Sequence, residues 1–183
     1  MRVTAGSVRG FNLVLPGGKN TRPTTGRIKE TLFNIIQWEV PESRFLDLFS
    51  GSGSIAIEAL SRGAKEAVLV DRDREAVRCM KENIKHTRME DRAQVMAMDV
   101  MQALRRLDEC GQPFDIIFMD PPYHKEFEAA VIPYLLDSSL VCESSLIIVE
   151  TALETDVSYM QEYSCQCERI KDYKTNRHVF LRV

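Results

Sequence analysis

Short apolar runs alternate with amphipathic segments along most of the chain, and this alternation constrains the fold more than any other feature. The runs RFLDLF, EAVLVD, QVMAMD, FDIIFMD and SLIIVE are typical of buried strands. Between such runs, apolar residues recur at helical spacing, as at Val77, Met80 and Ile84. Buried strands that alternate with helices predict a doubly wound, mainly parallel α/β sheet.

Both ends of the chain depart from this alternation. Residues 1–15 alternate polar and apolar residues around the turn SVRG, which predicts a small β-hairpin. After Glu150, one short helix and the runs SCQCERIKDY and RHVFLRV predict a terminal antiparallel hairpin. The 183 residues suit one domain, in which residues 1–20 form a basic hairpin extension and residues 21–183 form the core.

A helix is predicted ahead of the first strand. The segment TTGRIKETLFNIIQWE carries Ile28, Leu32 and Ile36 at helical spacing. Thr24 or Thr25 is suited to the N-cap position, because a threonine hydroxyl accepts a hydrogen bond from the first turn. We expect this helix to cover one side of the core.

The net charge of −3 is unevenly distributed. Residues 1–30 carry a net charge of +5, so the rest of the chain carries −8. We interpret the basic segment as a contact site for a polyanion, with a solvated basic tail as the alternative.

The cysteines and the apolar runs indicate the compartment. Five scattered cysteines, an odd number, fit a reducing compartment better than a disulfide framework. Cys165 and Cys167 form a lone C-x-C with no second pair, so no metal site is predicted. No apolar run approaches the roughly 20 residues of a membrane helix, and the first residues lack a signal-like apolar region. We expect a cytoplasmic protein without a membrane partner.

Four of the five predicted strands end in or close to an aspartate, namely Asp47, Asp71, Asp99 and Asp120. Ligands bind to doubly wound sheets outside the carboxyl ends of the strands. Any one of these acids is also suited to a helix cap or a turn. Four at one edge favour a ligand site, because like charges brought together destabilise a fold unless something compensates them.

A glycine-rich loop follows the first of these strands. It has the spacing G-x-G-x-x-A from Gly51, and Asp71 lies twenty residues beyond Gly51 at the next strand end. This arrangement predicts an adenosine cofactor, whose ribose hydroxyls an acid in that place can bind. Asp47 precedes the glycines and would repel a pyrophosphate, whereas S-adenosyl-L-methionine brings an ammonium and a sulfonium. The loop therefore favours adenosylmethionine.

The run FDIIFMD ends in Asp120-Pro121-Pro122-Tyr123. Two prolines stop a strand and hold the carbonyl groups beyond it rigidly. The alternative interpretation is a strand-terminating turn with a core tyrosine.

In this order and spacing, DLFSGSG, LVDRD, the acid at Asp99 and DPPY resemble the class I adenosylmethionine-dependent methyltransferases that modify exocyclic amino groups of bases. MRVTAGSVRGFNLVLP, RPTTGRIKETLFNII, DLFSGSG-x-x-x-x-EALSRGA and KDYKTNRHVFLRV extend the likeness over nearly the whole chain. They resemble the bacterial 16S ribosomal RNA guanine-N2 methyltransferases of the small ribosomal subunit. The resemblance implies a seven-stranded, Rossmann-like methyltransferase sheet.

For the reaction, the resemblance implies that DPPY holds the target base. Asp120 and the carbonyl group of Pro121 would accept hydrogen bonds from the exocyclic amine, and Pro122 would keep the turn rigid. Tyr123 offers a ring face on which a flipped base can stack.

For the cofactor, resemblance and chemistry together assign binding residues. Asp47 and the loop would hold the methionine end, Asp71 the ribose, and Asp99 with Val100 the adenine. The expected cofactor-binding residues are Thr24, Thr25, Asp47, Phe49, Ser50, Gly51, Ser52, Gly53, Asp71, Arg72, Asp99 and Val100.

For the substrate, the resemblance implies 16S ribosomal RNA within an assembled or partly assembled 30S subunit, bound by a monomer. Arg9, Arg22 and Lys29 are expected to contact phosphates. Two alternatives remain open. One is an amino-methyltransferase for DNA adenine or protein glutamine, although the chain has no room for a DNA target-recognition module. The other is a non-catalytic RNA-binding assembly factor.

Overall fold

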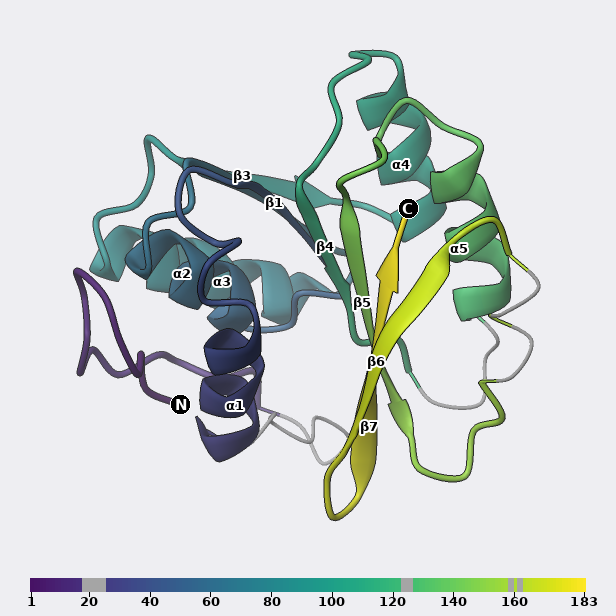
Figure 1. Cartoon of the computed structure of the whole chain (residues 1–183). Helices are drawn as coiled ribbons and strands as arrows, with labels where there is room; N and C mark the ends of the chain where they lie inside the picture. The colour runs from purple at the N-terminus through teal and green to yellow at the C-terminus, as the bar shows by residue number, and fades with distance from the viewer. Residues whose placement is uncertain (18–25, 123–126, 158–159, 161–162) are drawn as a thin grey trace.

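The computed structural model describes residues 1–17, 26–122, 127–157, 160 and 163–183. These residues contain one seven-stranded sheet with the order β3-β2-β1-β4-β5-β7-β6 (Figure 1). The strands are β1 (Arg44–Leu48), β2 (Glu66–Asp71), β3 (Ala93–Ala97), β4 (Ile116–Met119), β5 (Leu146–Ala152), β6 (Gln166–Asp172) and β7 (Asn176–Arg182). Strands β1 to β5 are parallel and β7 is antiparallel to both of its neighbours, which confirms the predicted sheet and its terminal hairpin.

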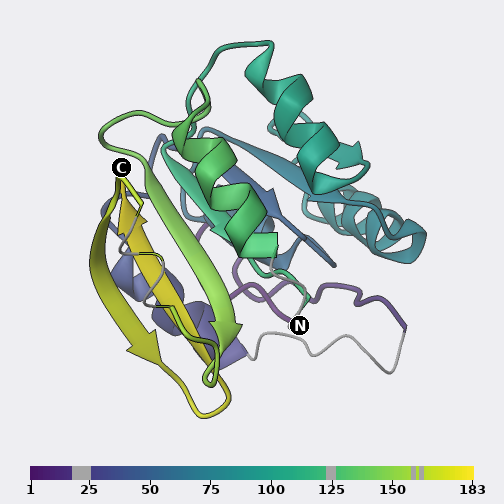
Figure 2. The ribbon, with the colours of Figure 1, turned by 90° about the vertical axis from the view of Figure 1, so that its right-hand side faces the viewer.

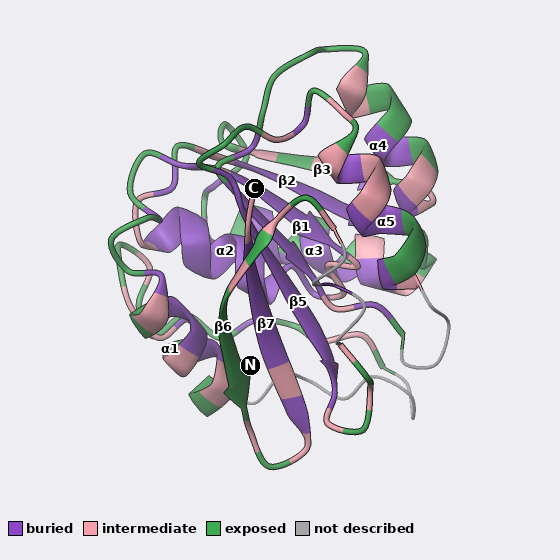
Figure 3. Cartoon of the chain, turned by 45° about the vertical axis from the view of Figure 1, so that its right-hand side comes forward, coloured by how far each residue is buried: buried purple, intermediate pink, exposed green. Residues whose placement is uncertain are grey.

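Helices cover both faces of the sheet (Figure 2). They are α1 (Gly26–Ile35), α2 (Ser54–Ser61), α3 (Arg74–His86), α4 (Val100–Asp108) and α5 (Phe127–Leu136). Side chains of α1, α2 and α3 form one apolar core against the sheet, and side chains of α4 and α5 form the other. The central strands are buried on both faces, whereas β6 is an exposed edge (Figure 3). This burial explains why β1, β2, β4 and β5 are almost continuously apolar in sequence.

The N-terminal segment pairs with itself but forms no regular strands. Arg2 and Asn12 make an isolated antiparallel bridge, and the Val3 amide donates to the Phe11 carbonyl at 3.0 Å. The predicted hairpin is therefore present in an irregular form. Helix α1 ends at Ile35, earlier than its sequence pattern indicates.

Two expectations fall on residues that the structure does not describe. The predicted caps Thr24 and Thr25 lie outside the described residues. The short helix expected after Glu150 falls partly on residues 158–159 and 161–162, which also lie outside them.

A buried ion pair fastens the N-terminal segment to the core. The Lys29 ammonium lies 2.9 Å from a carboxylate oxygen of Glu58, and both side chains are fully buried. Lys29 also donates to the Arg2 carbonyl at 3.0 Å, and Glu58 accepts from the Thr4 amide at 2.9 Å. The prediction that Lys29 contacts phosphates is therefore wrong, because its charge is used inside the protein.

None of the helices in the described part of the chain is long and apolar enough to span a bilayer.

Candidate active site

A cavity of about 600 Å³ opens at the carboxyl ends of the parallel strands. It lies where β1 and β4 are neighbours, because the chain builds β2 and β3 on one side of β1 and then crosses to β4 on the other. Such a switch point is where doubly wound sheets bind ligands. The predicted site residues that line the cavity are Asp47, Phe49, Ser50, Gly51, Ser52, Asp71, Arg72, Asp99, Val100, Asp120, Pro121 and Pro122.

The two glycines of the loop have different roles. Both have positive φ, +55° at Gly51 and +75° at Gly53. A Cβ atom on Gly51 would meet no protein atom within 4 Å, whereas one on Gly53 would lie 2.8 Å from a Leu69 methyl group. Gly53 does not line the cavity, and its amide donates to the Ser50 carbonyl at 2.8 Å. Gly53 thus permits the loop to pack on β2, and its contact with the cofactor stays a prediction.

Asp47 is a buried acid at the cavity wall, 1% exposed. It accepts a hydrogen bond from the Ala56 amide at 3.2 Å. Burial, with a smaller contribution from the charge of Asp71, raises the pKa of Asp47 to about 8. A buried carboxyl of this kind favours a cationic ligand, because a nearby positive charge restores the ionised form.

Asp71 ends β2 and orders the loop. One of its oxygens accepts from the Gly51 amide and the other from the Asp73 amide, both at 2.9 Å. Each oxygen keeps a further lone pair for a hydroxyl. The side chain is thus already oriented for the ribose contact that the spacing predicts.

Asp99 has both of the roles considered for an acid at a strand end, because it caps a helix and also lies at the ligand cavity. It caps α4 by accepting from the Met101 amide at 3.0 Å, and it also lines the cavity. Its other oxygen lies 3.6 Å from a guanidinium nitrogen of Arg72. Val100 is buried beside it, so a polar group and an apolar group adjoin at this end of the cavity.

Asp120 follows β4 at the other side of the switch point. Burial raises its pKa well above the ordinary value, and the charges of Glu150 and Asp47 raise it further. Pro121 is buried and Pro122 is exposed, so the turn runs from the core to the surface. Tyr123, the predicted stacking residue, lies outside the described residues.

The structure adds cavity residues that sequence reasoning missed. Glu150 ends the run SLIIVE, so the pattern of acids at strand ends could have identified it. Thr175 and Asn176 come from the terminal hairpin and carry no local sequence signal. The other cavity residues outside the prediction include Met1, Leu15, Pro16, Ile28, Met98 and Phe127.

The residues present fit adenosylmethionine. Asp47 can become the anionic partner of an ammonium, the open side of Gly51 allows close approach, and Asp71 has lone pairs for a ribose. With the sheet order, this site defines a class I adenosylmethionine-dependent methyltransferase.

Comparison with known proteins narrows this class. Residues 1–181 match the model of the family described as Conserved hypothetical protein 95. Ribosomal RNA small subunit methyltransferase D of Haemophilus influenzae is 35% identical over 153 residues, covering 82% of this chain and 78% of that protein. The protein of the same name from Escherichia coli K12 is 34% identical over 154 residues, covering 84% and 76%. A solved structure of a hypothetical protein from Thermus thermophilus gives a TM-score of 0.85 at 33% identity, covering 100% and 99%. The chain belongs to this family of ribosomal RNA methyltransferases.

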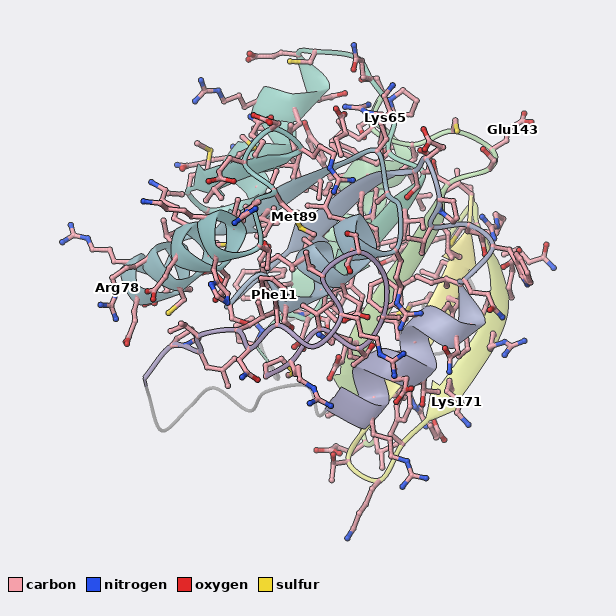
Figure 4. All side chains as sticks on the ribbon, turned by 90° about the vertical axis from the view of Figure 1, so that its left-hand side faces the viewer. Phe11, Lys65, Arg78, Met89, Glu143 and Lys171 are labelled. Atoms are coloured by element: carbon pink, nitrogen blue, oxygen red, sulfur yellow. The ribbon has the colours of Figure 1, made fainter. Side chains whose placement is uncertain are left out.

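The residues predicted to contact RNA differ in where the structure places them. Arg9 is exposed on the N-terminal hairpin, and Arg22 lies outside the described residues. The hairpin packs on α3, since the Phe11 ring lies 5.1 Å from the His86 ring. Figure 4 shows Phe11 and Arg78 on the same side of the molecule. The exposed basic residues of α3, which sequence reasoning missed, are Arg74, Arg78, Lys81 and Lys85.

Proposed function

We propose that this protein transfers a methyl group from adenosylmethionine to the exocyclic N2 amine of a guanine in the 16S RNA of the small ribosomal subunit. The observation that carries the proposal is Asp120, a half-buried acid in a rigid turn beside the cofactor cavity. The relatives named small subunit methyltransferase D support the RNA class. The protein would act as a monomer in the cytoplasm, on an assembled or partly assembled subunit.

Binding and orientation come from the loop and the strand ends. Asp47 would hold the ammonium, Asp71 the ribose and Asp99 the adenine, in line with their places around the cavity. When bound, adenosylmethionine supplies an electrophilic methyl group on a positively charged sulfur. Thr24 and Thr25 remain predicted cofactor contacts.

Asp120 and Pro121 act on the amine. The lone pair of an aromatic amine is delocalised into the ring, so the amine must be oriented before it can attack. Asp120 and the Pro121 carbonyl accept its hydrogens and aim the lone pair at the methyl group. Tyr123 remains the predicted stacking residue for the base.

Asp120 also has the properties of a proton acceptor. Burial and the charges of Glu150 and Asp47 raise its pKa, so its carboxylate binds a proton more strongly than an ordinary aspartate does. Methyl transfer would place a positive charge on the amine nitrogen, next to Asp120, and the carboxylate of Asp120 would take the proton that the methylated amine releases.

Positioning on RNA would come from the N-terminal hairpin and α3. Arg9 and Arg22 remain proposed phosphate contacts, joined by the exposed basic residues of α3. Of these, Arg78 lies on the same side of the molecule as Phe11 of the hairpin (Figure 4).

The test uses small subunits from cells that lack this protein, incubated with methyl-labelled adenosylmethionine. We expect one N2-methylguanosine per subunit after nuclease digestion. Label in DNA or in protein glutamine would favour the other amino-methyltransferases. Cofactor binding without transfer to any of these substrates would favour the assembly-factor alternative.

A further inference from the structure

A buried polar network borders the cavity on the side away from the glycine loop. It joins Glu150 on β5 to Asn176 and His178 on β7, and these side chains are at most 4% exposed. Glu150 and Asn176 both line the cavity. The function derived so far makes no use of this network.

The hydrogen bonds of the network fix the orientation of the Asn176 amide. One Glu150 oxygen accepts from Asn176 Nδ2, and the other lies 3.0 Å from His178 Nε2. The Tyr173 hydroxyl lies 3.2 Å from His178 Nδ1. A carboxylate only accepts hydrogen bonds, so the nitrogen of the Asn176 amide must face Glu150 and its oxygen must face away.

That oxygen, Asn176 Oδ1, has no hydrogen-bond partner among the described residues, although it is buried. An unpaired buried acceptor is unfavourable, and buried polar groups almost always have a partner. Asn176 cannot rotate to pair Oδ1 without losing its bond to Glu150. Asn176 lines the cavity, so a ligand bound there can bring the missing donor.

The sheet order indicates which ligand approaches Asn176. The expected adenosine contacts, Asp71 and Asp99, lie at β2 and beyond β3, on one side of β1. Asp120 follows β4, and Asn176 begins β7 on the far side of it. A ligand group beside Asn176 therefore belongs to the substrate that enters past Asp120, and not to the adenosine.

A guanine has a donor in the required place. Its N1–H group adjoins the N2 amine on the edge that enzymes read in a flipped base. Adenine has no hydrogen on N1, and a glutamine side chain has no second donor of this kind.

We propose that Asn176 selects guanine, with its Oδ1 accepting a hydrogen bond from N1–H while Asp120 and the Pro121 carbonyl hold the neighbouring N2 amine. The proposal rests on the proposed function and adds to it the residue that recognises the base. Glu150 is then a positioning residue, which acts through the amide of Asn176.

The test replaces the target guanosine by 2-aminopurine riboside, which keeps the 2-amine but has no hydrogen on N1. Small subunits are assembled from RNA with either base at the methylated position. For the unmodified protein, we expect kcat/KM to be about 10- to 100-fold lower on 2-aminopurine, since a site built for a donor rejects an analogue without it. For Asn176→Ala, we expect a similar loss on guanosine and at most about threefold further loss on 2-aminopurine.

Lys171→Ala is the matched control, because Lys171 is exposed on β6 of the same hairpin. It should discriminate between the two bases as the unmodified protein does. Cofactor affinity, measured by calorimetry, should be unchanged in both variants. If Asn176→Ala does not fold, Asn176→Ser gives the same comparison, since its shorter side chain keeps a donor but withdraws from the cavity.

Discrimination by the Asn176 variants equal to that of the unmodified protein would overturn the proposal. A loss of cofactor affinity in the variants as large as their loss of kcat/KM would also overturn it, by assigning Oδ1 to the cofactor. Equal rates of the unmodified protein on both bases would refute the selection of guanine by Asn176 but would leave the proposed function standing. No methylation of guanosine would refute the proposed function itself.

Discussion

Two of the acidic centres in the described part of the chain differ in where their compensating charge comes from. Glu58 is compensated by its own chain, because burial opposes its charge but Lys29 and the donors of Thr4 outweigh burial and lower its pKa. Asp47 and Asp120 have raised pKa values, because burial dominates and neighbouring acids add to it. Removing one partner of a buried pair leaves the other charge uncompensated, whereas a buried acid without such a partner is a candidate site for a cationic ligand.

The largest effect is expected at Asp120. The variant Asp120→Ala should lower kcat about 10³-fold or more, because it removes an acceptor aimed at the reacting amine. Its free energy of unfolding should stay within about 1 kcal/mol, since Asp120 belongs to none of the ion pairs among the described residues. Kinetics, calorimetry and denaturant unfolding measure these quantities. A large loss of cofactor affinity would contradict the role given to Asp120.

Lys29 should show the opposite behaviour. The variant Lys29→Met should lower the free energy of unfolding by about 3 to 5 kcal/mol, because it leaves Glu58 buried without its counter-charge. Lys65→Met, at an exposed lysine, is the control and should change it by less than about 0.5 kcal/mol. Denaturant unfolding of both variants measures these changes. An unchanged stability with weaker RNA binding would restore the phosphate contact first expected for Lys29.

Asp47 should make both stability and cofactor binding depend on pH. An acid with a raised pKa in the folded state keeps its proton there while the unfolded state loses it. The ligand-free protein should therefore lose stability as pH rises from about 4 to 8. Cofactor affinity should rise with pH, by up to about tenfold per unit between about 5.5 and 7.5, because the ionised form binds the ammonium.

The variant Asp47→Asn should flatten both pH profiles, measured by thermal unfolding and calorimetry. A cofactor affinity that keeps its slope in Asp47→Asn would assign the titration to another group.

The smallest effects are expected at the two loop glycines, whose substitutions should change different properties of the protein. Both substitutions cost about 1 kcal/mol of stability through positive φ. Gly53→Ala should cost more than Gly51→Ala, because its methyl group meets Leu69. Gly51→Ala should instead weaken cofactor binding, since its methyl group enters the cavity. Thermal unfolding and cofactor titration of both variants test this, and equal effects in both assays would remove the distinction.

Much of the fold and of the cofactor half of the site could be predicted, because the signals are local. Apolar runs and helical spacing predict the strands and helices from neighbouring residues. The spacing from Gly51 to Asp71 spans a single strand–helix–strand unit. The burial of Lys29 also had a signal in the sequence, since Lys29 shares a helical face with Leu32 and Ile36. The basic composition of the N-terminal segment obscured that signal.

The sequence by itself determined the sheet class, the glycine loop with its acids and the rigid turn after Asp120. Only the tertiary structure decided that Lys29 pairs with Glu58 and that Glu150 holds Asn176. Glu150 and Asn176 are 26 residues apart and meet because β5 pairs with β7 in one particular antiparallel register. Such partners depend on strand order and register, which are set by the packing of the whole sheet and leave no trace in the spacing of nearby residues.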